Sequence, residues 1–352
     1  MKLGKINLGI DQPLYFIADI AANHDGDLSR AFDLIEKAKE SGADAAKFQN
    51  FIASKIVSKK GFKKIGNQLS HQSNWKKSVY EVYEDASIAY DWTEKLKAKC
   101  DAVGIEYFTS PYDFESVDYV NPFLNFYKIG SGDITWIDII EYIADKGKPI
   151  ILSTGASDLN DVKRAVYVLQ NKNIQTVLMQ CNTNYTASPD NFHYINLNVL
   201  KTFRKLYPKT ILGLSDHTHG HSTVLGAIAL GAQVFEKHFT DDNSREGPDH
   251  KFAMNPISWK NMVDSSYELR SALGDGIKRI EKNEYDTSRL QRRSLRYTGN
   301  LPKGHKLTKD DLFPTRPITE KGIPPYIINT LIGKELIIDV EVDNEIEYIH
   351  IK

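Results

Sequence analysis

The feature that most constrains the fold is a short apolar run that recurs eight times before residue 240 and each time ends in polar residues. Longer amphipathic stretches separate these runs. The runs lie at 15–19, 45–48, 105–109, 126–129, 149–153, 176–180, 210–214 and 233–238. Strands that alternate with helices indicate a parallel sheet, and eight such units in roughly 250 residues are typical of a (β/α)8 barrel. The sequence therefore predicts an α/β protein built on a TIM barrel.

Helical patterns fill the intervals between the runs. They are clearest at 28–41 and 159–169, and Ser157 or Asp158 is a suitable N-cap for the second of these. The last helix of the barrel is expected at about 256–273.

A long polar insertion, from 53 to about 85, separates the second run from the third. Gly61, Gly66 and the Asn74-Trp75 pair within it indicate a loop. Loops of this length in a compact domain are usually functional, so we expect this one to cover the mouth of the barrel.

The texture of the chain changes after residue 283. Proline and glycine punctuate the tail every few residues, with short β-like runs between them. This pattern predicts a small β-rich module that follows a charged segment at 279–289. We therefore expect a barrel domain over 1–283, and a linker with a small C-terminal domain over 284–352.

Composition excludes several classes of protein. The 45 Lys and Arg residues against 46 Asp and Glu leave a net charge of -1, so no global field favours nucleic acid or a membrane surface. No apolar stretch is long enough to span a bilayer. Cys100 and Cys181 form neither a CxxC pair nor a disulfide framework. We expect a soluble cytoplasmic protein that binds neither nucleic acid nor membrane.

Polar residues follow each predicted strand, and in a barrel they meet on one face. Lys47 and Lys128 lie within strand segments and are flanked by apolar residues. Burying an unpaired ammonium group costs several kcal/mol, so each lysine is expected to face an anionic ligand or, alternatively, a neighbouring carboxylate. Lys237 alternates with Glu236 and His238, and should point outward to the helices.

Two histidines end neighbouring strands, His217 in the seventh and His238 in the eighth. Strands about 4.8 Å apart allow two imidazoles to share one ion. Two nitrogens completed by carboxylate or water suit Mn²⁺, Mg²⁺ or Co²⁺ better than a closed zinc site. His219 and His221 precede a predicted helix and are expected to be exposed.

Small turns follow two strands, Gly130-Ser-Gly and Ser153-Thr-Gly. Backbone amides at the start of a helix bind phosphate, so these turns together with the lysines indicate a phosphate-bearing ligand. The loop at 246–250 reads Glu-Gly-Pro-Asp-His. From the residues alone, Asp249 and His250 are equally consistent with a functional loop and with an ordinary turn.

The order and spacing of several strings resemble the sialic acid (N-acetylneuraminate) synthase family. They are 20–26 Ile-Ala-Ala-Asn-His-Asp-Gly, 47–49 Lys-Phe-Gln, 109–111 Thr-Ser-Pro, 128–131 Lys-Ile-Gly-Ser, 214–218 Leu-Ser-Asp-His-Thr, 236–238 Glu-Lys-His and 247–250 Gly-Pro-Asp-His. The tail, with Leu301-Pro-Lys-Gly and Gly322-Ile-Pro-Pro, is similar to that family's C-terminal antifreeze-like (SAF) domain.

The resemblance implies condensation of phosphoenolpyruvate with an open-chain N-acetylated amino sugar, such as N-acetylmannosamine, to give a nonulosonic acid and phosphate. It places His217 and His238 on a divalent metal, Mn²⁺ by preference. It places around phosphoenolpyruvate Lys47, Ser110, Lys128, Ser131, Ser153 and Ser215, and at the sugar Thr183, Tyr185 and Asp249. Arg316 matches an arginine that reaches the partner's sugar site, which implies a domain-swapped homodimer.

In this chemistry C3 of the enol ester attacks the aldehyde, water captures the cationic C2, and the lysines offset the charge of the departing phosphate. Either Glu236 or Asp19 could move the protons. The chain departs from the family at 18–21, which reads Ala-Asp-Ile-Ala rather than Ala-Glu-Ile-Gly, and at Thr186, where proline is usual. Both changes concern the sugar end, so a legionaminic, pseudaminic or other nonulosonate precursor is an alternative acceptor.

Two rival functions stay open on the sequence. One is a pyruvate aldolase or lyase, either metal-dependent or acting through a Schiff base on Lys128. The other is a noncatalytic barrel that presents the C-terminal module for carbohydrate or coat assembly. Phosphate release separates the first rival from a synthase, and loss of turnover on His238→Ala separates the second.

Overall fold

The computed structural model describes residues 1–352 except 10, 66–71 and 74. Its contacts divide the chain into two compact units, Met1–Gly274 and Asp275–Lys352. The expected boundary at 283/284 between folding domains stays a prediction. Gly66 and Asn74, two of the residues that indicated a loop, lie outside the described residues.

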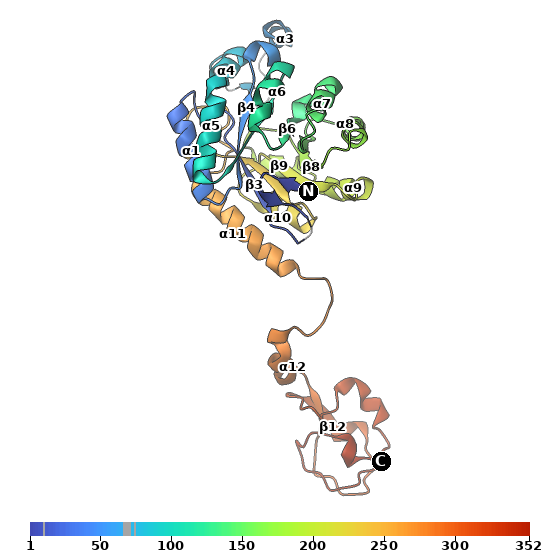
Figure 1. The fold of residues 1–352 in the computed structure, drawn as a ribbon. Helices are drawn as coiled ribbons and strands as arrows, with labels where there is room; N and C mark the ends of the chain where they lie inside the picture. Colours follow the sequence, from blue (N-terminus) through green and yellow to red (C-terminus); the bar gives the residue numbers. More distant parts are fainter. Residues whose placement is uncertain (10, 66–71, 74) are drawn as a thin grey trace. The chain divides into compact units, whose positions relative to one another are not determined.

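Eight parallel strands form the centre of the first unit (Figure 1). They are β3 (Tyr15–Asp19), β4 (Ala45–Asn50), β5 (Glu106–Pro111), β6 (Tyr127–Ile129), β7 (Ile150–Ser153), β8 (Thr176–Cys181), β9 (Ile211–Asp216) and β10 (Val234–His238). Their order is β5-β4-β3-β10-β9-β8-β7-β6, so the first and last strands of the chain's βα series are neighbours. Within the described residues no hydrogen-bonded ladder joins β5 to β6, and the barrel is nearly closed. The eight predicted strands are confirmed.

Helices lie around the outside of the strands (Figure 1). They are α1 (Leu28–Glu40), α5 (Tyr90–Val103), α6 (Phe114–Val120), α7 (Ile137–Ala144), α8 (Leu159–Asn171), α9 (Val199–Leu206), α10 (Ser222–Ala229) and α11 (Pro256–Leu273). Asp158 caps α8, because its side chain accepts from the Asn160 and Asp161 amides. Strands covered by helices on one side and by barrel interior on the other are buried on both faces, which explains their continuous apolar runs.

The insertion between β4 and β5 is not a bare loop. Its described residues form the helices α2 (Ala53–Ile56), α3 (Lys59–Lys64) and α4 (Val79–Ala86). A complete capping box starts α4, in which Ser78 and Glu81 satisfy each other's backbone amides. Ile56, Gln72, Trp75 and Tyr83 of this insertion line the cavity at the strand ends, so the expectation that it covers the barrel mouth is confirmed.

The amino terminus forms a two-stranded antiparallel hairpin, β1 (Lys2–Leu3) with β2 (Ile6–Asn7). Leu3 is buried in the barrel core. The segment after the hairpin leads into the amino end of β3, where Gln233 donates to the Gly9 carbonyl at 2.9 Å. The hairpin therefore belongs to the end of the barrel opposite the polar strand ends.

The second unit has a small core of its own, formed by Leu295, Tyr297, Leu307, Leu312, Ile323, Leu331, Leu336, Val340, Ile346 and Ile351. A short antiparallel pair, β11 (Ser294–Tyr297) with β12 (Leu312–Thr315), and isolated bridges connect its turns. The charged segment near the start of this unit leads into a short helix, α12 (Tyr285–Gln291). A small β-rich C-terminal domain is confirmed.

No helix among the described residues is both long enough and apolar enough to cross a bilayer.

Candidate functional site

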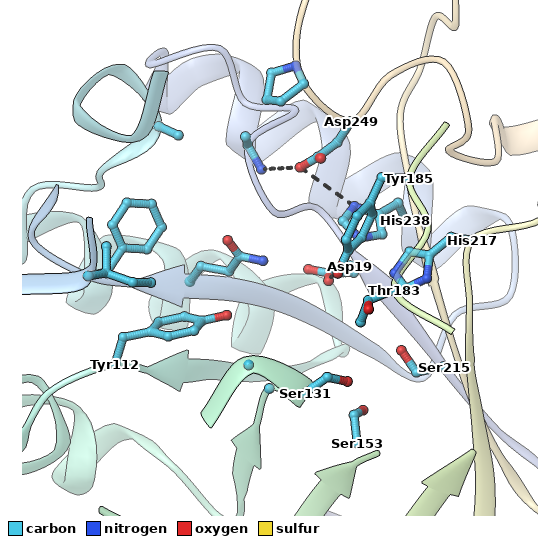
Figure 2. A pocket seen from close by; sticks show the side chains of 18 of the residues that line it. Asp19, Tyr112, Ser131, Ser153, Thr183, Tyr185, Ser215, His217, His238 and Asp249 are labelled. Atoms are coloured by element: carbon cyan, nitrogen blue, oxygen red, sulfur yellow. Dashed lines mark hydrogen bonds and ion pairs between the residues drawn. The ribbon is translucent and has the colours of Figure 1, made fainter. Parts of the chain in front are cut away.

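A cavity of about 510 Å³ lies at the carboxyl ends of the barrel strands (Figure 2). Its charged and polar lining residues come from β3, β4, β6, β7, β8, β9 and β10 or from the turns after them. They include Asp19, Lys47, Lys128, Ser131, Asp133, Ser153, Cys181, Thr183, Tyr185, Ser215, His217, Glu236, His238 and Asp249. The prediction that the imidazoles of 217 and 238 and the ammonium groups of 47 and 128 share one pocket is confirmed.

Strand register brings the charged residues together. The parallel ladders set Asp19 opposite Lys47 on one side and opposite His238 on the other, and set Ser215 opposite Glu236. Residues at matched positions on neighbouring strands point to the same side of the sheet, and here they point into the barrel. Side chains more than 200 residues apart in the chain therefore meet inside the barrel.

Both buried lysines are paired with carboxylates. The Lys47 ammonium lies 2.6 Å from Asp19 Oδ2 and 3.7 Å from Glu236 Oε2. The Lys128 ammonium donates to Glu236 Oε1 at 2.6 Å. Each lysine was expected to face either an anionic ligand or a carboxylate of the protein, and the structure shows the carboxylate. Both ammonium groups also line the cavity, where an anionic ligand would contact them.

The two buried carboxyl groups of this cluster differ in the direction of their net pKa shift. Burial raises the pKa of Asp19, and Lys47 only partly offsets the rise. Burial also opposes the charge on Glu236, but Lys128 and Lys47 outweigh it and lower the pKa of Glu236 to about 2. Glu236 is thus held as a carboxylate, whereas Asp19 is the carboxyl group better able to take up a proton.

The two imidazole rings are tilted by 49° to each other, with 5.3 Å between their centroids. Tyr185 packs against His217 at 4.3 Å and Phe252 against His238 at 4.9 Å, between ring centroids. Burial lowers the pKa of His217 to about 3 and that of His238 to about 4. Both rings are therefore neutral near pH 7, which is the form in which histidine binds metals.

The hydrogen bonds of the imidazoles suit a ligand role. His217 Nδ1 lies 2.8 Å from the Asn182 carbonyl, and because a carbonyl only accepts, Nδ1 carries the proton and Nε2 keeps its lone pair. His238 Nδ1 is buried without a hydrogen-bond partner. Among the residues that the structure describes, no group of three or more His, Cys, Asp or Glu side chains is arranged to hold a metal ion. The nitrogens that could donate to an ion here are His217 Nε2 and the unpartnered His238 Nδ1, the two histidines that the sequence indicated.

Formal charges within the cavity also suit a cation at these two histidines. The lining residues include two lysines and four carboxylates, at positions 19, 133, 236 and 249, so two negative charges are in excess when the histidines are neutral. An anionic substrate would add to this excess. A divalent cation beside the imidazoles would cancel it.

Hydroxyl groups lie at one side of the cavity, and Asp249, Tyr185 and His238 at the other (Figure 2). Ser215 donates to Glu236 Oε1 at 3.0 Å, and Ser131 accepts from the Gly155 amide at 2.9 Å. That amide is therefore already used, and the helix after it starts only at Leu159. Both small turns were expected to offer backbone amides at a helix start to phosphate. For the turn after β7 this is wrong, because the Gly155 amide already donates to the Ser131 hydroxyl.

Of the other predicted site residues, one is missing from the cavity lining and one belongs to the second unit. Ser110 is buried in β5 but is not among the lining residues. Arg316 lies in the second unit, exposed, after β12. His219 is exposed as expected, while Lys237 points out of the barrel as expected and is buried among the surrounding elements.

Sequence reasoning missed Asp133 and Tyr112, which also line the cavity. Burial raises the pKa of Asp133 to about 6. Asp133 follows the Gly130-Ser-Gly turn at once, so its place after a strand was the signal that could have identified it. Tyr112 directly follows the end of β5, so its position after a strand could have identified it in the same way.

The fold and this cavity define a (β/α)8-barrel enzyme with a small C-terminal β domain. A family model described as the NeuB family matches residues 34–278, and one described as the SAF domain matches 292–343. The chain belongs to the NeuB family of sialic and other nonulosonic acid synthases, enzymes that condense phosphoenolpyruvate with a sugar.

Individual relatives agree over nearly the whole chain. The N,N'-diacetyllegionaminic acid synthase of Legionella pneumophila is 33% identical over 353 residues, covering 98% of this chain and 96% of that protein. The human N-acetylneuraminate-9-phosphate synthase is 31% identical over 341 residues, covering 96% and 93%. The crystal structure of an N-acetylneuraminic acid synthetase from Leptospira borgpetersenii superimposes with a TM-score of 0.71 at 27% identity, covering 82% of this chain and 94% of that one.

Proposed function

We propose that this chain condenses phosphoenolpyruvate with an open-chain 2-acetamido hexose, releasing inorganic phosphate and a nonulosonic acid. One observation carries the proposal: serine hydroxyls lie at one side of a cavity that two lysines also line, and Asp249, Tyr185 and His238 lie at the other side (Figure 2). The first side suits the phosphate and carboxylate of phosphoenolpyruvate, and the second suits a sugar aldehyde and its hydroxyls. Relatives named for legionaminic, neuraminic and pseudaminic acids support this class of acceptor.

Lys47 and Lys128 are proposed to bind phosphoenolpyruvate, with Ser131, Ser153 and Ser215 as hydroxyl donors. Because Glu236 stays charged, its role is to hold the two lysines in place until the anion arrives. Ser110, buried in β5, stays a proposed contact of phosphoenolpyruvate that rests on the sequence resemblance alone.

Asp19 is proposed to accept the proton of the water that attacks C2, since burial already raises its pKa. It lies 3.6 Å from His238 Nε2, so it faces the sugar side of the cavity. Thr183, Tyr185 and Asp249 are proposed to contact the acceptor. When a divalent ion, Mn²⁺ by preference, binds His217 and His238, it supplies Lewis acidity for the aldehyde oxygen.

The test is phosphate release that requires phosphoenolpyruvate, an acceptor and a divalent ion together. Acceptors to screen are N-acetylmannosamine and diacetamido hexoses, with mass determination of each product. Pyruvate in place of phosphoenolpyruvate should give no product. Product from pyruvate, or a borohydride-stable adduct on Lys128, would support an aldolase instead.

Asp19 also bears on the identity of the acceptor. Asp19→Glu adds one methylene and moves the carboxylate toward the sugar. We expect this variant to change the ratio of kcat/KM between acceptors more than the KM for phosphoenolpyruvate. Equal effects on both substrates would remove Asp19 from the sugar side.

Arg316 is proposed to act on the sugar in the partner subunit of a domain-swapped homodimer. Mixing Arg316→Ala with His217→Ala should then restore part of the activity, because a heterodimer holds one intact site. No recovery on mixing, with heterodimers shown to form, would contradict the swap.

A further inference from the structure

Beside the cavity, a polar cluster that is partly buried joins the loop after β3 to the loop after β10. We call it the Asp25 cluster, and its members are Asp25, Arg30, Thr240, Arg245 and His250. His250 and Thr240 are both 0% exposed. His250 Nε2 lies 2.9 Å from Asp25 Oδ1, and His250 Nδ1 lies 2.7 Å from Thr240 Oγ1.

Asp25 is the centre of this cluster. Its other oxygen, Oδ2, accepts from Arg245 at 2.9 Å and lies 3.2 Å from Arg30 Nε. Burial opposes a charge on Asp25, but His250, Arg245 and Arg30 outweigh it and lower its pKa. Asp25 is therefore a carboxylate, and His250 Nε2 must be the donor in their hydrogen bond.

The loop after β10 closes tightly over the imidazole of His250. A Cβ atom at Gly247 would lie 2.6 Å from His250 Cδ2 and 3.0 Å from Nε2. Real side chains do not approach so closely, so residue 247 must be glycine for the ring to reach Asp25. These contacts fix the position of the His250 ring relative to both loops.

His250 directly follows Asp249, which faces the cavity. Asp249 Oδ2 accepts from the Ala22 amide at 3.3 Å and lies 3.7 Å from His238 Nδ1 (Figure 2). Ala22 also lines the cavity and belongs to the same loop as Asp25. The two loops are therefore joined twice, once outside the cavity through His250 and once at its wall through Asp249.

We propose that His250, held between Asp25 and Thr240, is a positioning residue that sets the carboxylate of Asp249 at the sugar side of the cavity. This inference rests on the proposed function for what Asp249 contacts. Loosening the cluster frees Asp249 without touching the lysines or hydroxyls that face phosphoenolpyruvate. The acceptor and phosphoenolpyruvate should therefore respond differently.

Thr240→Val tests the proposal with the least change of shape, because valine lacks only the hydroxyl. We expect the KM for the acceptor to rise about tenfold, the equivalent of one buried hydrogen bond, and the KM for phosphoenolpyruvate to stay within about twofold. Thr240→Ser keeps the hydroxyl and should restore the acceptor KM. Equal rises in both KM values would mean general damage and would overturn the proposal.

Asp25→Asn tests the centre of the cluster, and Asp44→Asn is its matched control. Asp44 is also a partly buried aspartate that accepts a backbone hydrogen bond, from Phe16 at 2.8 Å, but it precedes β4 at the other end of the barrel. Only Asp25→Asn should raise the acceptor KM. If Asp44→Asn raises it equally, or Asp25→Asn leaves it unchanged, the cluster does not position Asp249.

Hydrogen exchange of the substrate-free protein gives a readout that needs no activity. Backbone amides at 20–27 and 240–254 should exchange faster together in Asp25→Asn and Thr240→Val, and not in Asp44→Asn. If the wild-type protein releases no phosphate, the proposed function fails. The hydrogen-exchange rates still test whether the Asp25 cluster holds the two loops together. Unchanged exchange in both loops would overturn the proposal itself.

Discussion

Two buried charge clusters lie on opposite faces of the same strand, β10. Glu236 and His238 point into the barrel, and Lys237 between them points out toward the helices. All three side chains are at most 7% exposed. Burial alone therefore does not tell a functional charge from a structural one.

The outer cluster is complete. Asp216 Oδ2 accepts from Lys237 and, at 2.8 Å each, from the hydroxyls of Thr218 and Thr223. Lys237 also donates to the Thr218 carbonyl at 2.7 Å. Burial opposes the charge on Asp216, but Lys237 outweighs it and keeps its pKa low. Every strong donor of the cluster meets an acceptor inside the protein.

The inner cluster is incomplete. Asp19 Oδ1, Glu236 Oε2 and His238 Nδ1 are buried without hydrogen-bond partners, and all three residues line the cavity. Buried polar groups in native proteins are normally paired, so an unpaired group calls for an explanation. The difference between the two faces shows that the site is marked by buried polar atoms without partners around a cavity. Buried charge alone does not mark it.

The largest expected effect is on turnover when the inner face is changed. His238→Ala should lower kcat by roughly 10³-fold, because the imidazole pair is lost. Stability should change little, since no hydrogen bond of His238's side chain is lost. Phosphate release, metal content and chemical denaturation measure the three outcomes. Turnover within tenfold of wild type would show that the incomplete face is not catalytic.

On the outer face the effect should fall on stability instead. Lys237→Met leaves Asp216 as an uncompensated buried charge, which costs about 3–5 kcal/mol. The kcat of the protein that remains folded should stay close to wild type. Chemical denaturation together with active-site titration checks this. A variant of wild-type stability with lost turnover would reverse the assignment of the two faces.

Asp133 offers a pH test of opposite sign to Asp216. Burial raises its pKa to about 6, so the folded state binds the proton more tightly than the unfolded state does. Stability from this group is therefore greatest below about pH 4 and falls, by at most about 3 kcal/mol, as the pH rises past 6. Denaturation at pH 4.5 and 7.5 should show this fall in wild type and not in Asp133→Asn. For Asp216, whose pKa is lowered, stability is instead lost as the pH falls.

The smallest expected effect comes from adding a methyl group at Gly155, beside the inner face. A Cβ at Gly155 would lie 2.4 Å from Thr183 Cγ2 and 2.9 Å from Ser131 Oγ. Gly155→Ala should displace the Ser131 hydroxyl and raise the KM for phosphoenolpyruvate about tenfold, the value of one hydrogen bond. Gly299→Ala is the control, because a Cβ there meets nothing within 4 Å. An unchanged KM in Gly155→Ala would show that Ser131 does not bind this substrate.

Much of the barrel could be predicted because its signals are local. Each strand is one apolar run, and the polar residue that ends it is read directly from the chain, as for His217 and His238. Asp133 and Tyr112 were missed although they too follow strands, since neither stands out by residue type. The Asp25 cluster could not be predicted, because its partners lie more than 200 residues apart and depend on two loops meeting.

By itself the sequence determined the eight strands, the face on which each side chain lies, and the imidazole and ammonium groups that share one end of the barrel. Alternation along a strand is a property of neighbouring residues, so it needs no knowledge of the rest of the fold. Only the tertiary structure decided the partners: that Lys47 and Lys128 meet carboxylates, that Ser110 stays behind the wall, and that His250 reaches Asp25. Those pairings follow from strand register and loop closure, which the whole barrel sets at once.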